Sequence, residues 1–241
     1  ISEMNQALQL GQFEVWYQPQ FNQVSGVLIG AEALVRWNHP NKGLIAPEVF
    51  VPIFEKNGFI YEIDQYVWEQ TCILLRDMID RKTPLIPISV NVSGYDISCE
   101  DIVDRLIGLI QKYEIPVSSL RLEITESAFV RSSERIIQVV EQLRQYGFIM
   151  GIDDFGSGYT SLKTLKDVPA DMVKLDMRFL ETEHNPDRGG NILESIVRMA
   201  RWIGMSVIAE GVEEPEQAEY LKSIGCYNVQ GFFYSKPLQT C

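Results

Sequence analysis

The chain has 241 residues and a formal net charge of −12, with 46% hydrophobic and 22% charged residues. This acidic balance excludes a general binding surface for polymeric nucleic acid, because contacts to phosphates require a patch of Lys and Arg. The apolar runs fall short of about 18 residues and no basic leader with a cleavage site is present, so we expect a cytoplasmic domain without membrane contact. The length suits a single large core.

The four cysteines indicate neither a disulfide framework nor a site for a soft metal, because they are far apart and form no C-x-x-C pair. They are Cys72, Cys99, Cys226 and Cys241. The chain opens on Ile1 rather than Met and continues directly into a helix-like segment, residues 3–10. We therefore expect one domain, residues 1–241, taken from a longer polypeptide.

The first two predicted strands are residues 13–21 and 27–37, and only residues 22–26 separate them. A parallel pair needs a crossover of about a dozen residues, so these strands should form an antiparallel hairpin.

After the hairpin, the pattern alternates between helices and strands. The expected helices are residues 47–56, 63–81, 134–146, 191–203 and 215–224, with a short helix near 161–165. A further helix is expected to begin at a capping box of Ser98 and Asp101 and to end at Tyr113. The expected strands are residues 86–92, 120–124, 148–153, 172–175, 206–209 and 227–232. Residues 181–190 are expected to form an irregular surface loop.

This order predicts eight strands, seven of them in a βα alternation and the first reversed. It is typical of a TIM-like (β/α)8 barrel with the first strand antiparallel. An open doubly wound sheet is the alternative, but no strand is followed by the glycine-rich fingerprint G-x-G-x-x-G.

Asp153 and Asp154 follow an apolar run, residues 148–152, that predicts a buried strand. Burying paired carboxylates costs free energy unless a cation is present. Gly156 and Gly158 would let the next loop close over a bound anion. The alternative is a strand-end turn in which an aspartate caps a helix that starts near residue 160.

Polar residues stand near the ends of nearly all the predicted strands, and in a barrel the carboxyl ends of the strands meet at one mouth. In chain order they are Glu32, Asn91, Glu123, Asp153 with Asp154, Lys174 with Asp176, Glu210 and Gln230. Any one of them alone would more often be a solvated residue. Their repetition predicts a functional site at the mouth.

Carboxylate and amide oxygens favour Mg²⁺ or Mn²⁺ over Zn²⁺, and the chain has only two histidines. Both of these, His39 and His184, are expected at the surface. Adjacent aspartates could share two ions about 3.5–4 Å apart, an arrangement that suits in-line attack on a phosphodiester. Lys174 would either pair with Asp176 or orient the attacking water.

These residues resemble the EAL domains of bacterial cyclic di-GMP phosphodiesterases over nearly the whole chain. The matching segments are Glu32-Ala33-Leu34, Tyr17-Gln18-Pro19, Ser89-Val90-Asn91, Leu122-Glu123 through Glu126, Asp153 through Tyr159, Val173-Lys174-Leu175-Asp176, Ala209-Glu210 through Glu213, and Gln230-Gly231 through Pro237. The tripeptide alone is a weak signal, whereas the ordered set is specific.

The resemblance implies hydrolysis of cyclic di-GMP to linear 5′-pGpG with two Mg²⁺ or Mn²⁺ ions. It implies metal ligands at Glu32, Asn91, Glu123, Asp153 and Asp154, and catalytic residues at Lys174, Glu210 and Glu126. Glu210 would act as a ligand or as the general base, and Glu126 would fix the loop after Asp153. Substrate contacts are implied for Gln18, Leu34, Arg36, Asp176, Glu213 and Gln230. The resemblance also makes a homodimer through the loop region plausible.

Two other functions stay open at this point. A receptor of the same family would bind cyclic di-GMP without cleaving it, but such receptors usually lack part of the acid set or of the loop sequence. A barrel using one Mg²⁺ for an unrelated phosphate substrate is disfavoured by the ordered motifs. Formation of 5′-pGpG separates these functions.

Overall fold

The structure is a computed structural model that describes residues 2–131, 133–156, 168–177 and 186–239. Its strands are β1 (Phe13–Asn22), β2 (Val27–His39), β3 (Gly43–Ile45), β4 (Ile88–Asn91), β5 (Leu120–Thr125), β6 (Ile149–Phe155), β7 (Met172–Asp176), β8 (Ser206–Glu210), β9 (Asn228–Val229) and β10 (Leu238–Gln239). Its helices are α1 (Ser2–Gln9), α2 (Pro47–Asn57), α3 (Ile60–Asp80), α4 (Gly94–Ser98), α5 (Ile102–Tyr113), the 3₁₀ turn η1 (Val117–Ser119), α6 (Glu126–Arg131), α7 (Ser133–Gln145), α10 (Pro186–Trp202) and α11 (Pro215–Ser223).

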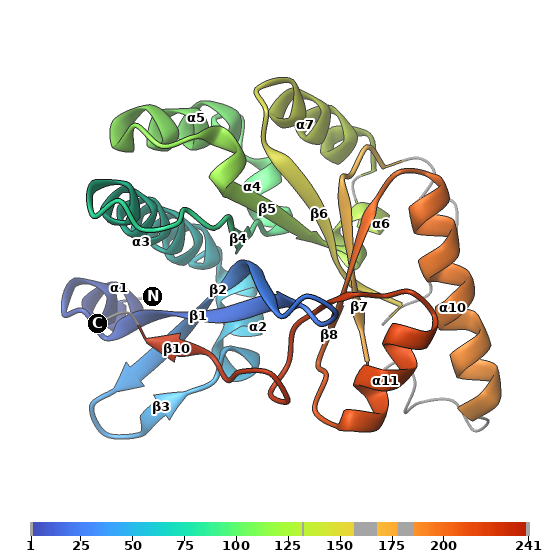
Figure 1. Ribbon diagram of the computed structural model, residues 1–241. Helices are drawn as coiled ribbons and strands as arrows, with labels where there is room; N and C mark the ends of the chain where they lie inside the picture. Colours follow the sequence, from blue (N-terminus) through green and yellow to red (C-terminus); the bar gives the residue numbers. More distant parts are fainter. Residues whose placement is uncertain (1, 132, 157–167, 178–185, 240–241) are drawn as a thin grey trace.

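The strands close into a barrel, as the alternating pattern predicts. β1 pairs with both β2 and β9, so the order β1-β9-β8-β7-β6-β5-β4-β2 returns to its start. β1 is antiparallel to both neighbours, and the other barrel strands run parallel to one another. β3 and β10 extend the sheet outside the barrel. The predicted barrel with a reversed first strand is confirmed, and Figure 1 shows the helices surrounding it.

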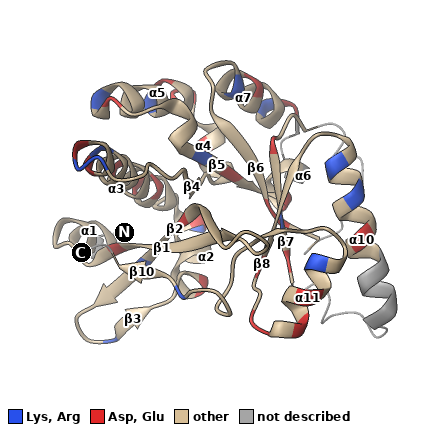
Figure 2. Cartoon of the chain, viewed as in Figure 1, with Lys and Arg blue, Asp and Glu red and all other residues tan. Residues whose placement is uncertain are grey.

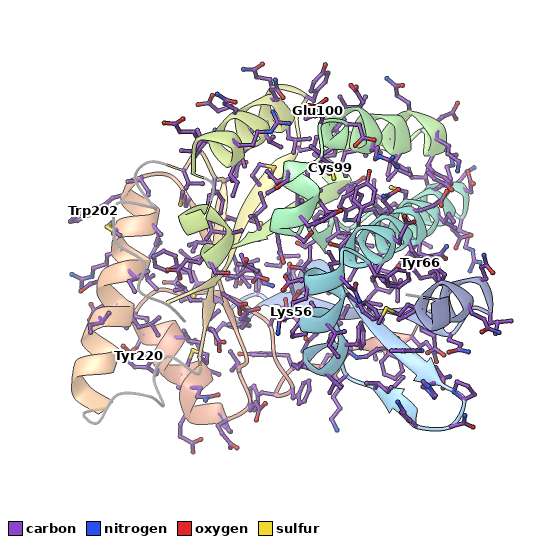
Figure 3. The ribbon with its side chains drawn as sticks, turned by 180° about the vertical axis from the view of Figure 1, so that it is seen from behind. Lys56, Tyr66, Cys99, Glu100, Trp202 and Tyr220 are labelled. Atoms are coloured by element: carbon purple, nitrogen blue, oxygen red, sulfur yellow. The ribbon has the colours of Figure 1, made fainter. Side chains whose placement is uncertain are left out.

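The apolar core lies mainly between the strands and the helices that cover them. Trp68 and Ile63 of α3, Val139 of α7 and Leu122 of β5 are fully buried there. Trp202, at the end of α10, is 86% exposed and projects outward (Figure 3). Lys and Arg are spread over the outer helices among Asp and Glu (Figure 2). No helix in the described ranges has the length and apolar character that crossing a membrane requires.

The predicted capping box of Ser98 and Asp101 is wrong. The box is formed one helix earlier, where Ser93 Oγ accepts from the backbone N–H of Asp96 and the Asp96 carboxylate accepts from the backbone N–H of Ser93. Ser98 instead ends α4, and its hydroxyl donates to the carbonyl of Gly94. The apolar pattern did not separate the short helix α4 from α5.

Two further expectations are corrected. Helix α10 already includes residues 186–190, which were expected in a loop, because Pro186 at its start needs no hydrogen-bonded N–H. His39, expected at the surface, is buried, and its ring lies 5.3 Å from that of Trp37. The predicted short helix near 161–165, and His184, lie outside the described residues.

Candidate metal centre

The interior of the barrel is polar at its carboxyl end. Strand alternation points Glu32, Glu123, Asp153, Lys174 and Glu210 inward from five different strands. All except Glu210 are buried, and Glu210 is partly exposed. In the strand register Glu123 lies beside Asn91, and Glu210 lies beside Asp176. Residues that are distant in sequence therefore share one small volume.

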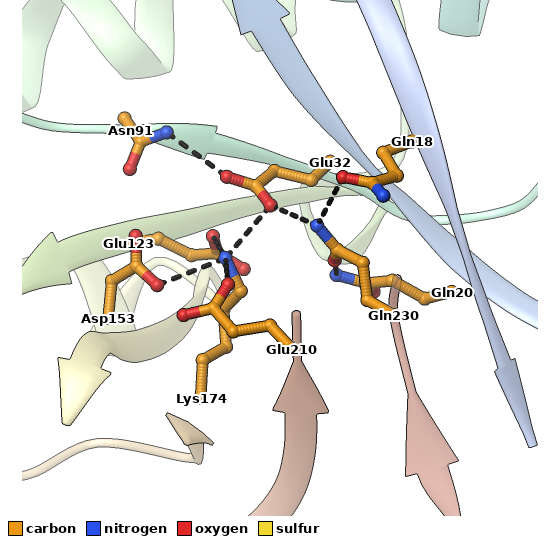
Figure 4. A network of polar contacts seen from close by, with 9 residues as sticks. All are labelled: Gln18, Gln20, Glu32, Asn91, Glu123, Asp153, Lys174, Glu210 and Gln230. Atoms are coloured by element: carbon orange, nitrogen blue, oxygen red, sulfur yellow. Dashed lines mark hydrogen bonds and ion pairs between the residues drawn. The ribbon is translucent and has the colours of Figure 1, made fainter. Parts of the chain in front are cut away.

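The Lys174 ammonium lies at the centre of the carboxylates (Figure 4). Its Nζ is 2.9 Å from Glu32 Oε2, 2.9 Å from Glu123 Oε2, 3.0 Å from Asp153 Oδ1 and 3.0 Å from Glu210 Oε2. The sequence left open whether Lys174 pairs with Asp176 or faces a catalytic water, and the structure places it against these four acids. One positive charge cannot neutralise four carboxylates, so the cluster favours further positive charge.

Burial and the contact with Lys174 shift the pKa values of these acids in opposite directions. Burial raises the pKa of Glu123 to about 8, although Lys174 acts in the opposite direction. Burial likewise holds the pKa of Glu210 well above its ordinary value. Burial also opposes ionisation of Glu32, but Lys174 and the amides of Gln230 and Asn91 outweigh it and lower its pKa. Glu123 and Glu210 therefore hold protons readily in the absence of a divalent cation.

Two groups of acids have the spacing of metal ligands. Carboxylate oxygens of Glu32, Glu123 and Asp153 lie within 4.8 Å of one another, and so do those of Asp153, Asp154 and Glu210. Glu123 Oε1 is buried and has no hydrogen-bond partner among the described residues. An all-oxygen donor set of this kind fits Mg²⁺ or Mn²⁺, and Asp153 belongs to both groups.

A β-bulge lets the adjacent aspartates reach the same place. In a regular strand Asp153 and Asp154 would point to opposite faces. The register of β6 against β7 shifts between Ile152 and Phe155, and Asp154 has a φ of 54°, in the left-handed region. Bulges often re-aim side chains beside active sites, and Asp tolerates this conformation better than most residues. The bulge therefore brings Asp154 beside Glu210.

Glu126 begins α6 directly after β5, and its side chain is buried. Its Oε2 accepts a hydrogen bond of 2.8 Å from the backbone N–H of Gly156. Burial raises the pKa of Glu126, while the bond from Gly156 favours its ionised form. The expected contact between Glu126 and the start of the loop is thus present, whereas residues 157–167 lie outside the described part of the chain.

Side-chain amides cover one side of Glu32. Asn91 Nδ2 lies 3.4 Å from Glu32 Oε1, and Gln230 Nε2 donates to Glu32 Oε2 at 2.5 Å and to Gln18 Oε1 at 3.2 Å. The position of Gln230 depends on Gly231, where a Cβ atom would come within 2.1 Å of the Val212 carbonyl oxygen. Sequence reasoning missed Gln20, which also belongs to this group. Gln20 could have been predicted from the sequence, because it stands two residues after Gln18 in the same predicted strand and so shares its face.

The other predicted substrate residues lie around the acidic centre at different depths. Asp176 is buried at the end of β7, level with Glu210. Leu34 and Arg36 follow Glu32 along β2, and Arg36 is half-buried. Glu213 is exposed in the segment after β8. No described contact ties Glu213 to the carboxylates, so the structure alone gives it no role.

The fold and this site define a class of protein: a barrel with a reversed first strand and an acidic centre able to hold divalent cations at its mouth. The chain belongs to the EAL domain family, whose model matches residues 1–237.

The chain is 36% identical over 239 residues to the bifunctional diguanylate cyclase/cyclic di-GMP phosphodiesterase MucR of Pseudomonas aeruginosa. This match covers 99% of the chain and 35% of MucR. The chain is also 33% identical over 232 residues to the cyclic di-GMP phosphodiesterase PdeL of Escherichia coli. This match covers 96% of the chain and 64% of PdeL. The chain thus spans only part of the length of these relatives.

Two solved structures are similar over nearly the whole chain. The PaMucR phosphodiesterase in complex with c-di-GMP matches with a TM-score of 0.93 at 36% identity, covering 99% of this chain and 97% of that one. The EAL enzyme Bd1971, in its form with cAMP and cyclic di-GMP bound, matches with a TM-score of 0.91 at 30% identity, covering 99% and 65%.

Proposed function

We propose that this chain is a phosphodiesterase that hydrolyses cyclic di-GMP to linear 5′-pGpG with Mg²⁺ or Mn²⁺ at the acidic centre. The observation that carries the proposal is the pair of acid groups that share Asp153 at the barrel mouth. Homology to cyclic di-GMP phosphodiesterases supports the same substrate.

We assign two sets of metal ligands. Glu32, Asn91, Glu123 and Asp153 would hold one ion. Asp153 and Asp154, with Glu210 directly or through water, would hold the second. Bound in this way, divalent ions lower the pKa of a water molecule and stabilise charge on the phosphate.

The chain's own residues then act on water and substrate. Lys174, held among the carboxylates, would orient the attacking water. Glu210 is the candidate base, because it lies beside Asp153 and Asp154 and is partly exposed at the barrel mouth. The water oxygen would bond to phosphorus and give a proton to Glu210 as the P–O bond to one ribose breaks. The departing ribose oxygen would take up a proton from solvent.

Six residues would bind the cyclic dinucleotide around this centre: Gln18, Leu34, Arg36, Asp176, Glu213 and Gln230. The guanidinium of Arg36 would contact a phosphate, since Arg suits phosphate oxygens. Gln18 and Gln230 present amides beside Glu32. Glu126 would hold the loop after β6 through Gly156.

Larger assemblies are part of the proposal. Residues 1–241 would act as one EAL domain of a longer signalling protein, in line with the 35% of MucR that the chain spans. The domain would form a homodimer near the loop after β6. Light scattering on the purified domain, with and without cyclic di-GMP, measures that association.

The central experiment incubates the purified domain with cyclic di-GMP and Mn²⁺ and follows 5′-pGpG by chromatography. We expect 5′-pGpG to form with Mn²⁺ and no product in EDTA. Tight binding of cyclic di-GMP without product would replace the proposal with a receptor that senses the nucleotide.

A further inference from the structure

Gln20 is a fully buried polar residue that has no role in the proposed reaction. It lies on β1, two residues from Gln18, and its side chain is 0% exposed. A buried amide costs free energy unless its polar atoms are bonded. Gln20 Nε2 has a hydrogen-bond partner, whereas Gln20 Oε1 has none among the described residues.

Gln20 and its partner belong to a chain of amides that ends on a proposed metal ligand (Figure 4). Gln20 Nε2 donates to Gln230 Oε1 at 2.9 Å. Gln230 Nε2 in turn donates to Glu32 Oε2 at 2.5 Å and to Gln18 Oε1 at 3.2 Å. Both donor hydrogens and the carbonyl oxygen of Gln230 are thus engaged.

This arrangement gives the Gln230 amide a single favourable orientation. If the amide turned over, its oxygen would face the Glu32 carboxylate, and its NH₂ group would face the NH₂ group of Gln20. A hydrogen bond to an ionised group in a buried site is stronger than one between neutral groups. Gln20 therefore fixes Gln230, and Gln230 fixes the Glu32 oxygen.

The sequence provides room for Gln20. Gly30 lies opposite Gln20 in the β1–β2 ladder. A Cβ atom at Gly30 would come within 3.0 Å of Gln20 Oε1 and within 3.0 Å of the Pro87 carbonyl oxygen. A larger residue at position 30 would crowd Gln20 Oε1, the Pro87 carbonyl and the Arg121 guanidinium.

We propose that Gln20 is a positioning residue that orients Glu32 for divalent metal binding by way of the side-chain amide of Gln230. This inference rests on the metal centre of the proposed function. Its physical basis is general: groups that hold metal ligands in place typically contribute 10- to 100-fold to metal affinity.

The test measures Mn²⁺ affinity directly, by electron paramagnetic resonance of free Mn²⁺ in solutions of the folded domain. Gln20→Met keeps the length of the side chain and removes the donor. We expect Mn²⁺ to bind about 10- to 100-fold more weakly. Gln230→Met should weaken binding at least as much.

The double variant shows whether Gln20 acts through Gln230. In a Gln230→Met background, Gln20→Met should change the Mn²⁺ affinity by less than about twofold, because the link is already broken. Independent, additive losses would overturn the inference. So would a folded Gln20→Met variant that binds Mn²⁺ like the wild type.

Asn228→Leu is the matched control, since Asn228 accepts from Asn22 at 3.2 Å in an amide pair that joins β9 to β1 without reaching a carboxylate. It should lower stability but leave the Mn²⁺ affinity unchanged; an equal loss of affinity would reduce Gln20 to a structural residue. Wild-type 5′-pGpG formation is assayed in parallel. If the wild type forms 5′-pGpG and Gln20→Met binds Mn²⁺ like the wild type, only this inference is contradicted. If Gln20→Met loses Mn²⁺ affinity as expected but the wild type forms no 5′-pGpG, only the proposed reaction is contradicted.

Discussion

Glu32 combines three polar contacts in one carboxylate. Lys174 and Gln230 donate to one oxygen, and Asn91 lies near the other. These contacts keep the group ionised in spite of its burial. A carboxylate that is both buried and charged is a ready ligand for a divalent cation.

Glu32→Ala should therefore reduce 5′-pGpG formation by more than about 100-fold, since even the groups that orient ligands contribute 10- to 100-fold. The fold should survive, because the helices and the apolar core are untouched. Turnover is measured with Mn²⁺ and the fold by circular dichroism. The exposed Glu216→Ala serves as the control. Unchanged turnover in Glu32→Ala would remove Glu32 from the ligand set.

Asp64 and Asp96 form a second buried acidic pair, on α3 and α4, that sequence analysis did not predict. Burial, and then the neighbouring Asp96, hold the pKa of Asp64 well above its ordinary value of 3.8. Burial also raises the pKa of Asp96, which accepts from the N–H and hydroxyl of Ser93. A proton on Asp64 lets the pair bond without repulsion.

This pair makes stability depend on pH. The folded state holds the Asp64 proton more tightly than the unfolded state, so its contribution is complete below the unfolded pKa and is lost as pH rises toward the folded one. Asp64→Asn supplies the donor permanently. We expect about 1 kcal/mol more stability above neutral pH, or about 2–4 °C in Tm, and a flatter pH profile.

Thermal unfolding from pH 5 to pH 9 tests this expectation, with the exposed Asp104→Asn as control. An Asp64→Asn variant with lower stability and an unchanged slope would show that Asp64 is ionised in the folded state.

At the scale of elements, α6 connects the metal strands to the loop after β6. It follows β5 without a gap, so Glu126 stands only three residues after Glu123. The same helix receives the Gly156 N–H from the end of the bulged strand β6. The end of β6 and the metal strand β5 are consequently linked through Glu126.

Glu126→Ala should slow turnover by about 10-fold or more and accelerate amide hydrogen exchange at Gly156, which loses its acceptor. Exchange is followed by mass spectrometry of fragments that contain Gly156. Glu134→Ala, exposed on α7, is the control. Full activity together with unchanged exchange would dismiss the link.

At the scale of the whole molecule, closure of the barrel concentrates negative charge. Lys174 bonds to Glu32 across 142 positions of sequence, and the other carboxylates come from further strands. Without a divalent ion, Lys174 is the cation that the structure places among these acids. Folding and metal binding should therefore support each other.

Lys174→Met removes that cation. In EDTA we expect the free energy of unfolding to fall by about 3–5 kcal/mol, the range seen when one partner of a buried ion pair is lost. Saturating Mn²⁺ should recover about 2–3 kcal/mol or more. Urea unfolding measures both. Lys112→Met, whose pair with Glu69 is exposed, should leave the free energy of unfolding nearly unchanged. Equal stability of Lys174→Met and wild type in EDTA would contradict this account.

Local patterns in the sequence determined the order of the elements, the reversed first strand and the acids near the strand ends. They did so because strand alternation, turn residues and short connections act over a few positions. Glu32, Glu123 and Asp153 could be found in this way, since acids near buried strands are unusual without a partner. Contacts between side chains on different strands of the barrel could not be found from these local patterns.

Tertiary structure alone decided the partners of Lys174, the amide chain from Gln20 to Glu32, the left-handed Asp154 and the pairing of Asp64 with Asp96. Tertiary structure also determined that Ser93, and not Ser98, forms the helix cap. Each depends on groups that meet only when the strands close and the helices pack. Their charges and hydrogen bonds are set by that shared burial, which no stretch of sequence contains by itself.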